Sequence, residues 1–209
     1  SPTLALGVTK VRSNYGSYAA IKSDGTVVVW GDLARGGNAS SVSSLTNVIE
    51  IYPLGVNSGE KLQRCFVAKK NDGTISSWGD SAYGADLSSL TGTAVISHVA
   101  VNHYSAIAID NAGNFYGDGL YGNDINTNYY DAKGVSSNDL STITKISGNA
   151  GSYTAIRSDG SVLNWGLWAK NLSSTDALKS GVVSITSTYY NTSVLKDNGD
   201  VYTLSLIHI

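Results

Sequence analysis

The stretch SYAAIKSDGTVVVWGD, residues 17–32, contains the pattern that decides the fold. Two apolar runs flank its Asp-Gly pair, and close copies return as CFVAKKNDGTISSWGD at 65–80 and SYTAIRSDGSVLNWGL at 152–167. The runs are rich in β-branched and aromatic residues, which favour strands. An Asp-Gly pair between two strands favours a type I′ turn, because Gly adopts positive φ freely. Each stretch therefore predicts a β-hairpin.

Five copies of this hairpin follow one another along the chain. Their turn glycines, at intervals of 48, 40, 47 and 39 residues, are Gly25, Gly73, Gly113, Gly160 and Gly199. A pair of β-branched residues begins 17 residues before the glycine in four copies. In the second copy this distance is 25 residues, so we place an eight-residue insertion within YPLGVNSGEKLQ, residues 52–63. The third copy has Ala112 before its glycine and we expect it to be distorted and one residue shorter, with Tyr116 at the tryptophan position.

Each repeat supplies three strands, with room for a short fourth, and then a polar loop. The strands do not alternate cleanly between apolar and polar residues, which is typical of sheets covered on both faces. A β-propeller blade has this length and strand content, and blades bury their faces against each other. We therefore predict an all-β fold, an incomplete β-propeller of antiparallel blades over residues 1–203. Three tryptophans are expected to wedge between blades: Trp30, Trp78 and Trp165.

The repeat resembles a known family. Its AIKSDGTV, followed by WGD and a Gly-containing loop, is similar to the repeats of the regulator-of-chromosome-condensation family over residues 8–203. The family fold is a seven-bladed β-propeller, so the resemblance implies that four to five of seven blades are present. The short spacing is similar to that of compact bacterial members, including a secreted propeller that inhibits β-lactamases. The shared positions are structural, so the resemblance assigns no functional residue.

The repeat pattern breaks at Leu204. The repeat predicts Trp-Gly at positions 204 and 205, but the chain has LSLIHI from 204 to 209. The codons CTG TCT CTT ATA CAC ATC encode this string and match a transposon-end adaptor used to prepare DNA libraries. We therefore predict that residues 204–209 are a non-native, adaptor-derived tail on a metagenomic fragment. An ordinary C-terminal strand is the alternative.

The composition is weakly charged and rich in turn residues. The net charge is −2, 14% of residues are charged, and Lys and Arg are scattered, so we expect no nucleic-acid partner. No apolar run approaches the ~20 residues that span a bilayer, so we expect no membrane insertion. This composition is common outside cells. We therefore predict a bacterial protein that is secreted, extracellular or on the cell surface, with its signal peptide outside the fragment.

The sequence offers no clear catalytic or metal site. Cys65 is the one cysteine, and His98 and His103 have no Cys or Glu at metal-ligand spacing. No Gly-x-Ser-x-Gly nucleophile elbow is found, so we predict no enzyme activity, no cofactor and no metal. One polar loop is a weak calcium candidate, but it lacks the expected Gly and the closing Glu; its oxygen-bearing residues are Asp124, Asn126 and Asn128.

Aromatic residues in the loops are the candidate ligand contacts. Tyr and Trp bury a large area at a low cost in conformational entropy, which suits recognition. The candidates are Tyr83, Tyr121, Tyr129, Tyr130 and Trp168. The alternative is that some of them only cover blade edges.

The leading hypothesis is a non-enzymatic binding or scaffold module of a larger exported protein. It would engage a protein or a surface glycan through its blade loops. One alternative is a carbohydrate-binding propeller, which equivalent aromatics in every blade would favour; the sequence has them only in part. A second is an enzyme with its site at the channel mouth, on blades missing from this chain. Fold alone does not separate these functions.

Overall fold

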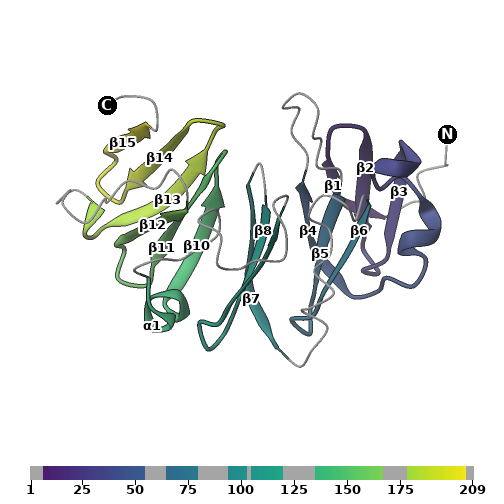
Figure 1. The fold of residues 1–209 in the computed structure, drawn as a ribbon, viewed down its shortest axis with the longest axis horizontal. Coiled ribbons are helices and arrows are strands. Elements are labelled where there is room, and N and C mark those ends of the chain that lie inside the picture. Colours follow the sequence, from purple (N-terminus) through teal and green to yellow (C-terminus); the bar gives the residue numbers. More distant parts are fainter. Residues whose placement is uncertain are drawn as a thin grey trace. The chain divides into compact units, whose positions relative to one another are not determined.

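The computed structural model describes residues 7–54, 65–79, 94–102, 105–119, 135–166 and 178–205. These residues form five three-stranded antiparallel sheets, here called blades 1 to 5, and each blade uses three strands that are consecutive in sequence (Figure 1). The strands are β1 (Val8–Ser13), β2 (Ser17–Lys22) and β3 (Val27–Gly31); β4 (Val48–Leu54), β5 (Cys65–Lys70) and β6 (Ile75–Gly79); β7 (Ile96–Val101), β8 (Ser105–Asp110) and β9 (Phe115–Gly119); β10 (Ile143–Gly148), β11 (Ser152–Arg157) and β12 (Val162–Gly166); β13 (Val182–Ser187), β14 (Asn191–Lys196) and β15 (Val201–Ser205). Two short 3-10 helices, η1 (Leu33–Arg35) and η2 (Ala39–Val42), follow blade 1, and α1 (Ser137–Ser141) precedes blade 4.

The chain divides into two compact units. The first comprises residues 1–96 and 118–122, and the second comprises residues 97–117 and 123–209. Blades 1 and 2 belong to the first unit, whereas blades 4 and 5 and most of blade 3 belong to the second. Each unit has its own apolar clusters of buried side chains between adjacent blades.

The turn between the second and third strands differs from the predicted type I′ turn. In blade 1 the amide of Gly25 donates to Lys22 O (2.9 Å), and Lys22 N donates to Thr26 O (2.9 Å). Ser23 and Asp24 are therefore the central residues, and Gly25 follows with φ 76°. Among the described non-glycine residues positive φ occurs at Asn47 alone, so the loop is a three-residue turn with a left-handed bulge glycine.

An aspartate explains this choice of turn. Asp24 Oδ1 accepts hydrogen bonds from Thr26 N (2.9 Å) and Thr26 Oγ1 (2.6 Å), which fixes the residues on both sides of the glycine. Asp72 and Asp159 make the same pair of bonds with Thr74 and Ser161. The aspartate therefore has to stand at the second central position of the turn, directly before the glycine, for its carboxylate to accept both bonds.

Blade 3 keeps the full repeat length, so the expectation of a shortened copy was wrong. β9 begins two residues after Gly113 and ends six residues after it, as the third strand does in the other blades. Asp118-Gly119 thus occupies the Trp-Gly position, and Tyr116 lies two residues earlier. Asp110 replaces the missing turn aspartate by accepting from Ala112 N and Asn114 N, both at 2.9 Å.

The extra residues of the second repeat lie between its first two strands. β4 has one residue more than its equivalents, and residues 55–64 connect it to β5, where the other blades use three residues. Residues 55–64 themselves lie outside the described residues. At the chain's other end β15 runs through Leu204 to Ser205 and pairs with β14. The adaptor origin of residues 204–209 stays a prediction.

Backbone hydrogen bonds join successive blades at the turn glycines. Val48 N donates to Gly25 O (3.0 Å), and Val182 N donates to Gly160 O (2.9 Å). Ile96 N makes the same bond to Gly73 O (2.9 Å). Gly25, Gly73 and Gly160 therefore have two roles, since each adopts positive φ and lets the segment that follows in the repeat approach closely.

Two of the tryptophans fill the space between blades. Trp78 stacks on Phe66 with ring centroids 5.2 Å apart, and both belong to the cluster that includes Val29 of blade 1. Its Nε1 donates to the carbonyl of Gly36, in the loop after blade 1 (3.1 Å). Trp165 stacks on Tyr153 in the same way, in a cluster with Ile107 and Ile109 of blade 3.

Candidate functional site

The ligand contacts expected from the sequence lie outside the described residues. This holds for the five loop aromatics, Tyr83, Tyr121, Tyr129, Tyr130 and Trp168, and for the calcium candidates, Asp124, Asn126 and Asn128. In the part of the chain that the structure describes, no three His, Cys, Asp or Glu side chains gather where they could hold a metal ion. No helix among the described residues is long and apolar enough to cross a membrane.

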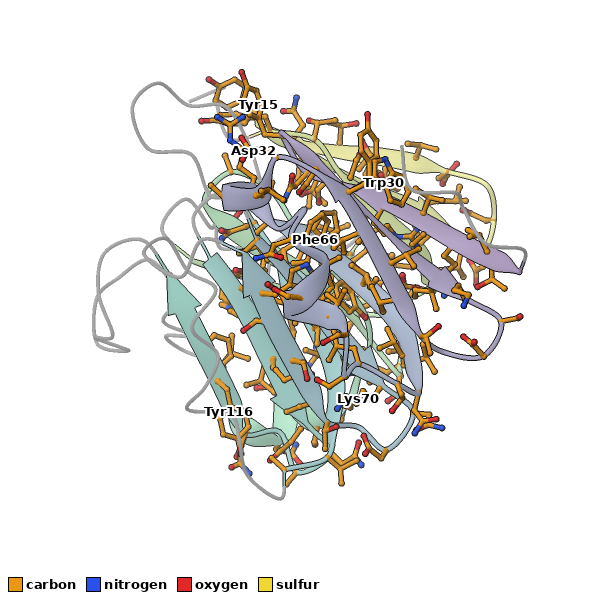
Figure 2. The ribbon with its side chains drawn as sticks, turned by 90° about the vertical axis from the view of Figure 1, so that its right-hand side faces the viewer. Tyr15, Trp30, Asp32, Phe66, Lys70 and Tyr116 are labelled. Atoms are coloured by element: carbon orange, nitrogen blue, oxygen red, sulfur yellow. The ribbon has the colours of Figure 1, made fainter. Side chains whose placement is uncertain are left out.

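One exposed group at the end of blade 1 has the chemistry of a binding surface. We call it the Tyr15 surface, and it consists of Tyr15, Asp32, Leu33 and Arg35. Tyr15 and Leu33 are 49% and 70% exposed. The guanidinium carbon of Arg35 lies 5.2 Å from the centroid of the Tyr15 ring, which is within cation–π range. Figure 2 shows Tyr15 and Asp32 close together at one end of blade 1, with Lys70, at the end of β5 in blade 2, well away from them.

The turn that carries Tyr15 is held by a partly buried network of hydrogen bonds. Asn14 Oδ1 accepts from Gly16 N (3.0 Å), Ser17 N (2.9 Å) and Ser17 Oγ (2.9 Å). Asn14 Nδ2 donates to Arg35 O (2.8 Å), and Ser17 Oγ, whose single proton serves one acceptor at a time, also lies 2.5 Å from Arg35 O. Ser17 is fully buried. The turn and the main chain of Arg35 are therefore locked together.

Asp32 positions the second half of the Tyr15 surface. Its Oδ1 accepts from Ala34 N (2.9 Å) and so caps η1. Its Oδ2 lies 3.0 Å from Arg35 Nε, forming an ion pair. Gly36 ends η1 with φ 97°. The Arg35 side chain thus has an aromatic ring and a carboxylate as fixed neighbours.

The turn scaffold repeats in blade 4, but its aromatic tip does not. Asn149 Oδ1 accepts from Gly151 N, Ser152 N and Ser152 Oγ, as Asn14 does in blade 1. The tip residue is the buried Ala150. In blade 5 the corresponding turn carries Tyr189 and Tyr190, whose rings meet edge to face with centroids 4.4 Å apart. Exposed tyrosines therefore occur at this turn in both units.

Sequence reasoning missed the Tyr15 surface. Tyr15 follows an asparagine and precedes Gly-Ser, and the same Asn-x-Gly-Ser pattern returns at 149–152 with alanine in the variable place. Comparison of these two turns would have shown that a structural motif presents an aromatic side chain in blade 1. Arg35 carried no sequence signal, because its role depends on the fold.

Charged side chains on the first strands of blades 1 and 2 form a separate cluster. Glu50 Oε2 lies 2.7 Å from Lys10 Nζ, and Glu50 Oε1 lies 2.9 Å from Arg12 Nη2. Burial opposes the charged form of Glu50, but hydrogen bonds from Lys10 and the Ile51 amide, together with Arg12, hold its pKa below the ordinary 4.5. Burial, aided by the Glu50 carboxylate, raises the pKa of Tyr52 to about 12. This cluster joins two blades.

Two open hollows occupy equivalent places in the repeat, beside the turn glycines. One has a volume of about 370 Å³ and lies around Lys22, Asp24 and Asn71. The other, of about 460 Å³, lies around Arg157 and Asp197. No aromatic side chain lines either hollow. They therefore lack a platform on which a sugar ring could stack.

Comparison with known proteins identifies the fold. No protein-family profile matches the chain, and no curated protein matches its sequence. Prp20p from Saccharomyces cerevisiae matches with a TM-score of 0.63 and 12% identity, over 95% of this chain and 57% of its own. Human WBSCR16 matches with a TM-score of 0.60 and 13% identity, over 95% of this chain and 61% of its own. The ectodomain of the receptor kinase CR4 from Physcomitrella patens matches with a TM-score of 0.61 and 14% identity, over 95% of this chain and 50% of its own.

These likenesses show the fold alone. The chain spans about half to three fifths of the length of these structures. With its five three-stranded sheets it is an all-β protein with the architecture of an incomplete β-propeller, and the predicted fold class is confirmed.

Proposed function

We propose that this chain is a non-enzymatic binding or scaffold module that engages a protein partner through the blade ends. The Tyr15 surface is the observation that carries the proposal. A few hot-spot residues carry most of the binding energy at protein interfaces, and they are enriched in Tyr, Trp and Arg. Tyr15 and Arg35 are exposed in part yet held by Asn14, Ser17 and Asp32, so little conformational entropy is lost when a partner binds.

Propellers of similar fold support a protein partner. Prp20p has been characterised for its binding to Gsp1p and histones, and yeast RCC1 (Prp20) has been solved bound to Kap60. The similarity to the AIKSDGTV and WGD repeats leads us to propose a compact, bacterial member of the regulator-of-chromosome-condensation family. The low charge and the content of Ser, Thr and Gly support an extracellular or cell-surface location within a larger exported protein.

Carbohydrate binding is the second candidate function. The feature that favours it is the Tyr189–Tyr190 pair in blade 5, in which Tyr190 is 48% exposed. Tyrosine faces stack on sugar rings, and a surface glycan would then be the ligand. The hollows beside the turn glycines do not support this function, because aromatic side chains are absent from their lining.

Site-specific photocrosslinking would test the proposed function. A photoreactive p-benzoylphenylalanine at position 15 would be irradiated in the secreted fraction of the bacterium that carries the gene, with the same residue at position 11, where Val11 is 48% exposed, as a matched control. The captured protein would be purified and titrated against the wild type, Tyr15→Ala and Arg35→Ala by calorimetry. We expect each substitution to weaken binding at least about tenfold, as for interface hot spots.

Two results would contradict the proposal. One is an unchanged dissociation constant for both variants. The other is saccharide binding on a glycan array that Tyr190→Ala abolishes and Tyr15→Ala leaves intact, which would move carbohydrate recognition ahead of protein binding.

A further inference from the structure

Arg35 carries the main binding chemistry of the Tyr15 surface, because its hydrogen-bond donors are unused. A guanidinium offers N–H donors on all of its nitrogens and has no acceptor. In the part of the chain that the structure describes, none of these donors makes a hydrogen bond. Arg35 Nε is buried without a hydrogen-bond partner, and its contact with Asp32 Oδ2 (3.0 Å) is an ion pair outside hydrogen-bond geometry. The side chain is 24% exposed, so part of it is open to a ligand.

Three neighbours fix the direction of this side chain. It lies across Gly16, where an added Cβ would come within 2.6 Å of Arg35 Cδ and 3.0 Å of Arg35 Nη1. The centroid of the Tyr15 ring is 5.2 Å from the guanidinium carbon, and the Asp32 carboxylate lies beside Nε (Figure 2). Arg35 is therefore held in place before a partner arrives, which lowers the entropy lost on binding.

The ligand that suits this guanidinium is a carboxylate. The planar fork of its nitrogens matches the two oxygens of a carboxylate, and such charge-assisted bonds are stronger than neutral ones. Phosphate groups, by contrast, are commonly recognised by clusters of arginines. Here the guanidinium stands beside a carboxylate, and the basic side chains of β1, Lys10 and Arg12, are held by Glu50 at 2.7 and 2.9 Å. One cation with an anionic neighbour favours a singly charged ligand.

Apolar surface adjoins the guanidinium. Leu33, two residues before Arg35 in η1, is 70% exposed, and Tyr15 is 49% exposed. Protein interfaces combine such aromatic and Arg anchors with apolar contact around them. A partner that brings a carboxylate next to an apolar side chain would therefore use both halves of the Tyr15 surface.

We propose that Arg35 binds a carboxylate of the protein partner, and that Tyr15 and Leu33 contact an apolar side chain beside it. The inference rests on the proposed function and describes its partner by chemistry. The carboxylate belongs to an Asp or Glu side chain or to the C-terminus of the partner, since both present the same pair of oxygens. Gly16 and Asp32 act as positioning residues for Arg35.

Titration of the ¹⁵N-labelled full chain with three dipeptides tests the proposal by NMR. N-acetyl-Leu-Glu-amide carries a side-chain carboxylate, N-acetyl-Leu-Gln-amide is its neutral counterpart, and N-acetyl-Leu-Gln with a free carboxyl end carries a terminal carboxylate. We expect saturable shifts of the Tyr15 and Arg35 resonances, with at least one charged peptide bound about fivefold more tightly than the neutral one. The tighter charged peptide identifies the source of the carboxylate. Equal affinity for all three peptides, or no shift with any of them, would overturn the proposal.

Two substitutions show whether Arg35 is the group that discriminates between the peptides. Arg35→Gln removes the charge and keeps the main-chain carbonyl that Asn14 binds, so all three peptides should bind equally weakly. Gly16→Ala keeps every charge but displaces the Arg35 side chain, and should reduce the preference for the charged peptide. Arg12→Gln is the matched control, because Arg12 is 39% exposed on the same blade and paired with Glu50, and the preference should equal that of the wild type. A preference that survives Arg35→Gln would contradict the assignment, and this comparison stands even if Gly16→Ala does not fold.

The carboxylate and the proposed function fail in different ways. Capture of a partner through position 15 tests the proposed function without any assumption about charge. A captured partner whose binding Tyr15→Ala weakens, together with peptides that bind regardless of charge, would overturn the carboxylate and leave the proposed function standing. Charge-selective peptide binding that Arg35→Gln abolishes, with no partner captured, would support the carboxylate site and count against the proposed function.

Discussion

Five glycines close the hairpins between the second and third strands, with φ from 76° to 91°. Their local geometry is shared, but their surroundings differ. A Cβ at Gly160 would lie 2.7 Å from Gly181 N, which belongs to the approach to blade 5, whereas a Cβ at Gly199 would meet nothing within 4 Å. Comparison of Gly160 with Gly199 therefore separates two reasons for glycine, namely the strain of positive φ and the close approach of neighbouring backbone.

Alanine at these two positions should destabilise the fold unequally. Gly199→Ala carries only the strain of a left-handed residue and should lower the free energy of unfolding by about 1 kcal/mol. Gly160→Ala adds a clash with backbone and should cost about 3 kcal/mol. Urea denaturation of both variants measures the difference. Equal losses would show that close approach to the next blade is not what requires glycine at 160.

Single residues also mark the limits of sequence reasoning. The turn glycines and tryptophans are visible as a period, because each repeat needs them at one position. The predicted turn type was wrong, because an Asp-Gly pair fits two loop geometries. The side-chain feature that favours the observed geometry is the Thr26 hydroxyl, which donates a hydrogen bond to Asp24. The role of Asp110 could not be foreseen, since it replaces a turn aspartate from two residues upstream.

At the scale of the element, the same aromatic pair meets different surroundings in successive blades. Trp165 is buried against blade 3, whereas Trp30 stacks on a half-exposed Tyr18. The sequence predicted wedges at equivalent positions, but it could not assign burial, which depends on the neighbouring blade. Residues 55–64 and the loop aromatics lie outside the described residues, and in the sequence they fall between the repeated landmarks, where no period supports a prediction.

Truncation of the two tryptophans should show this contrast. Trp165→Ala removes a fully buried ring and should cost about 3–5 kcal/mol of unfolding free energy. Trp30→Ala removes a ring that solvent already reaches and should cost less than about 2 kcal/mol in the monomer. Chemical denaturation at low protein concentration gives both values. Similar costs would contradict the assignment of Trp165 to a blade interface.

The contribution of the ion pairs between β1 and β4 to the free energy of unfolding should depend on pH. Because the folded pKa of Glu50 lies below its ordinary 4.5, its ion pairs stabilise the fold above about pH 4.5, and this contribution is lost as the pH falls through the folded pKa. Both cations are partly solvated, so Glu50→Gln should cost about 1 kcal/mol or less at pH 7. The difference between wild type and variant should shrink as the pH falls below 4.5 and disappear once the pH is below the folded pKa of Glu50. A difference independent of pH would exclude the ion pairs as its cause.

At the scale of the whole molecule, the five blades follow from one sequence repeat that occurs five times. Solved propellers match 95% of the chain at 12–14% identity, so the fold survives with few shared residues. The regular spacing of the sequence repeat determines the number and order of the strands. Packing between adjacent blades determines which face of a sheet each aromatic side chain occupies. Propellers of one fold host many functions, so we propose that function here depends on what the loops add, as at the Tyr15 surface on blade 1.

Amide hydrogen exchange tests the central claim, that the first residues of β4, β7 and β13 dock on the turn glycine that precedes them in the repeat. The amides of Val48, Ile96 and Val182 donate to the carbonyls of Gly25, Gly73 and Gly160. These three amides should exchange as slowly as that of Ala155, in the middle of a buried strand, since docking closes them from water. Exchange as fast as that of the exposed turn residue Asp24 would contradict the account.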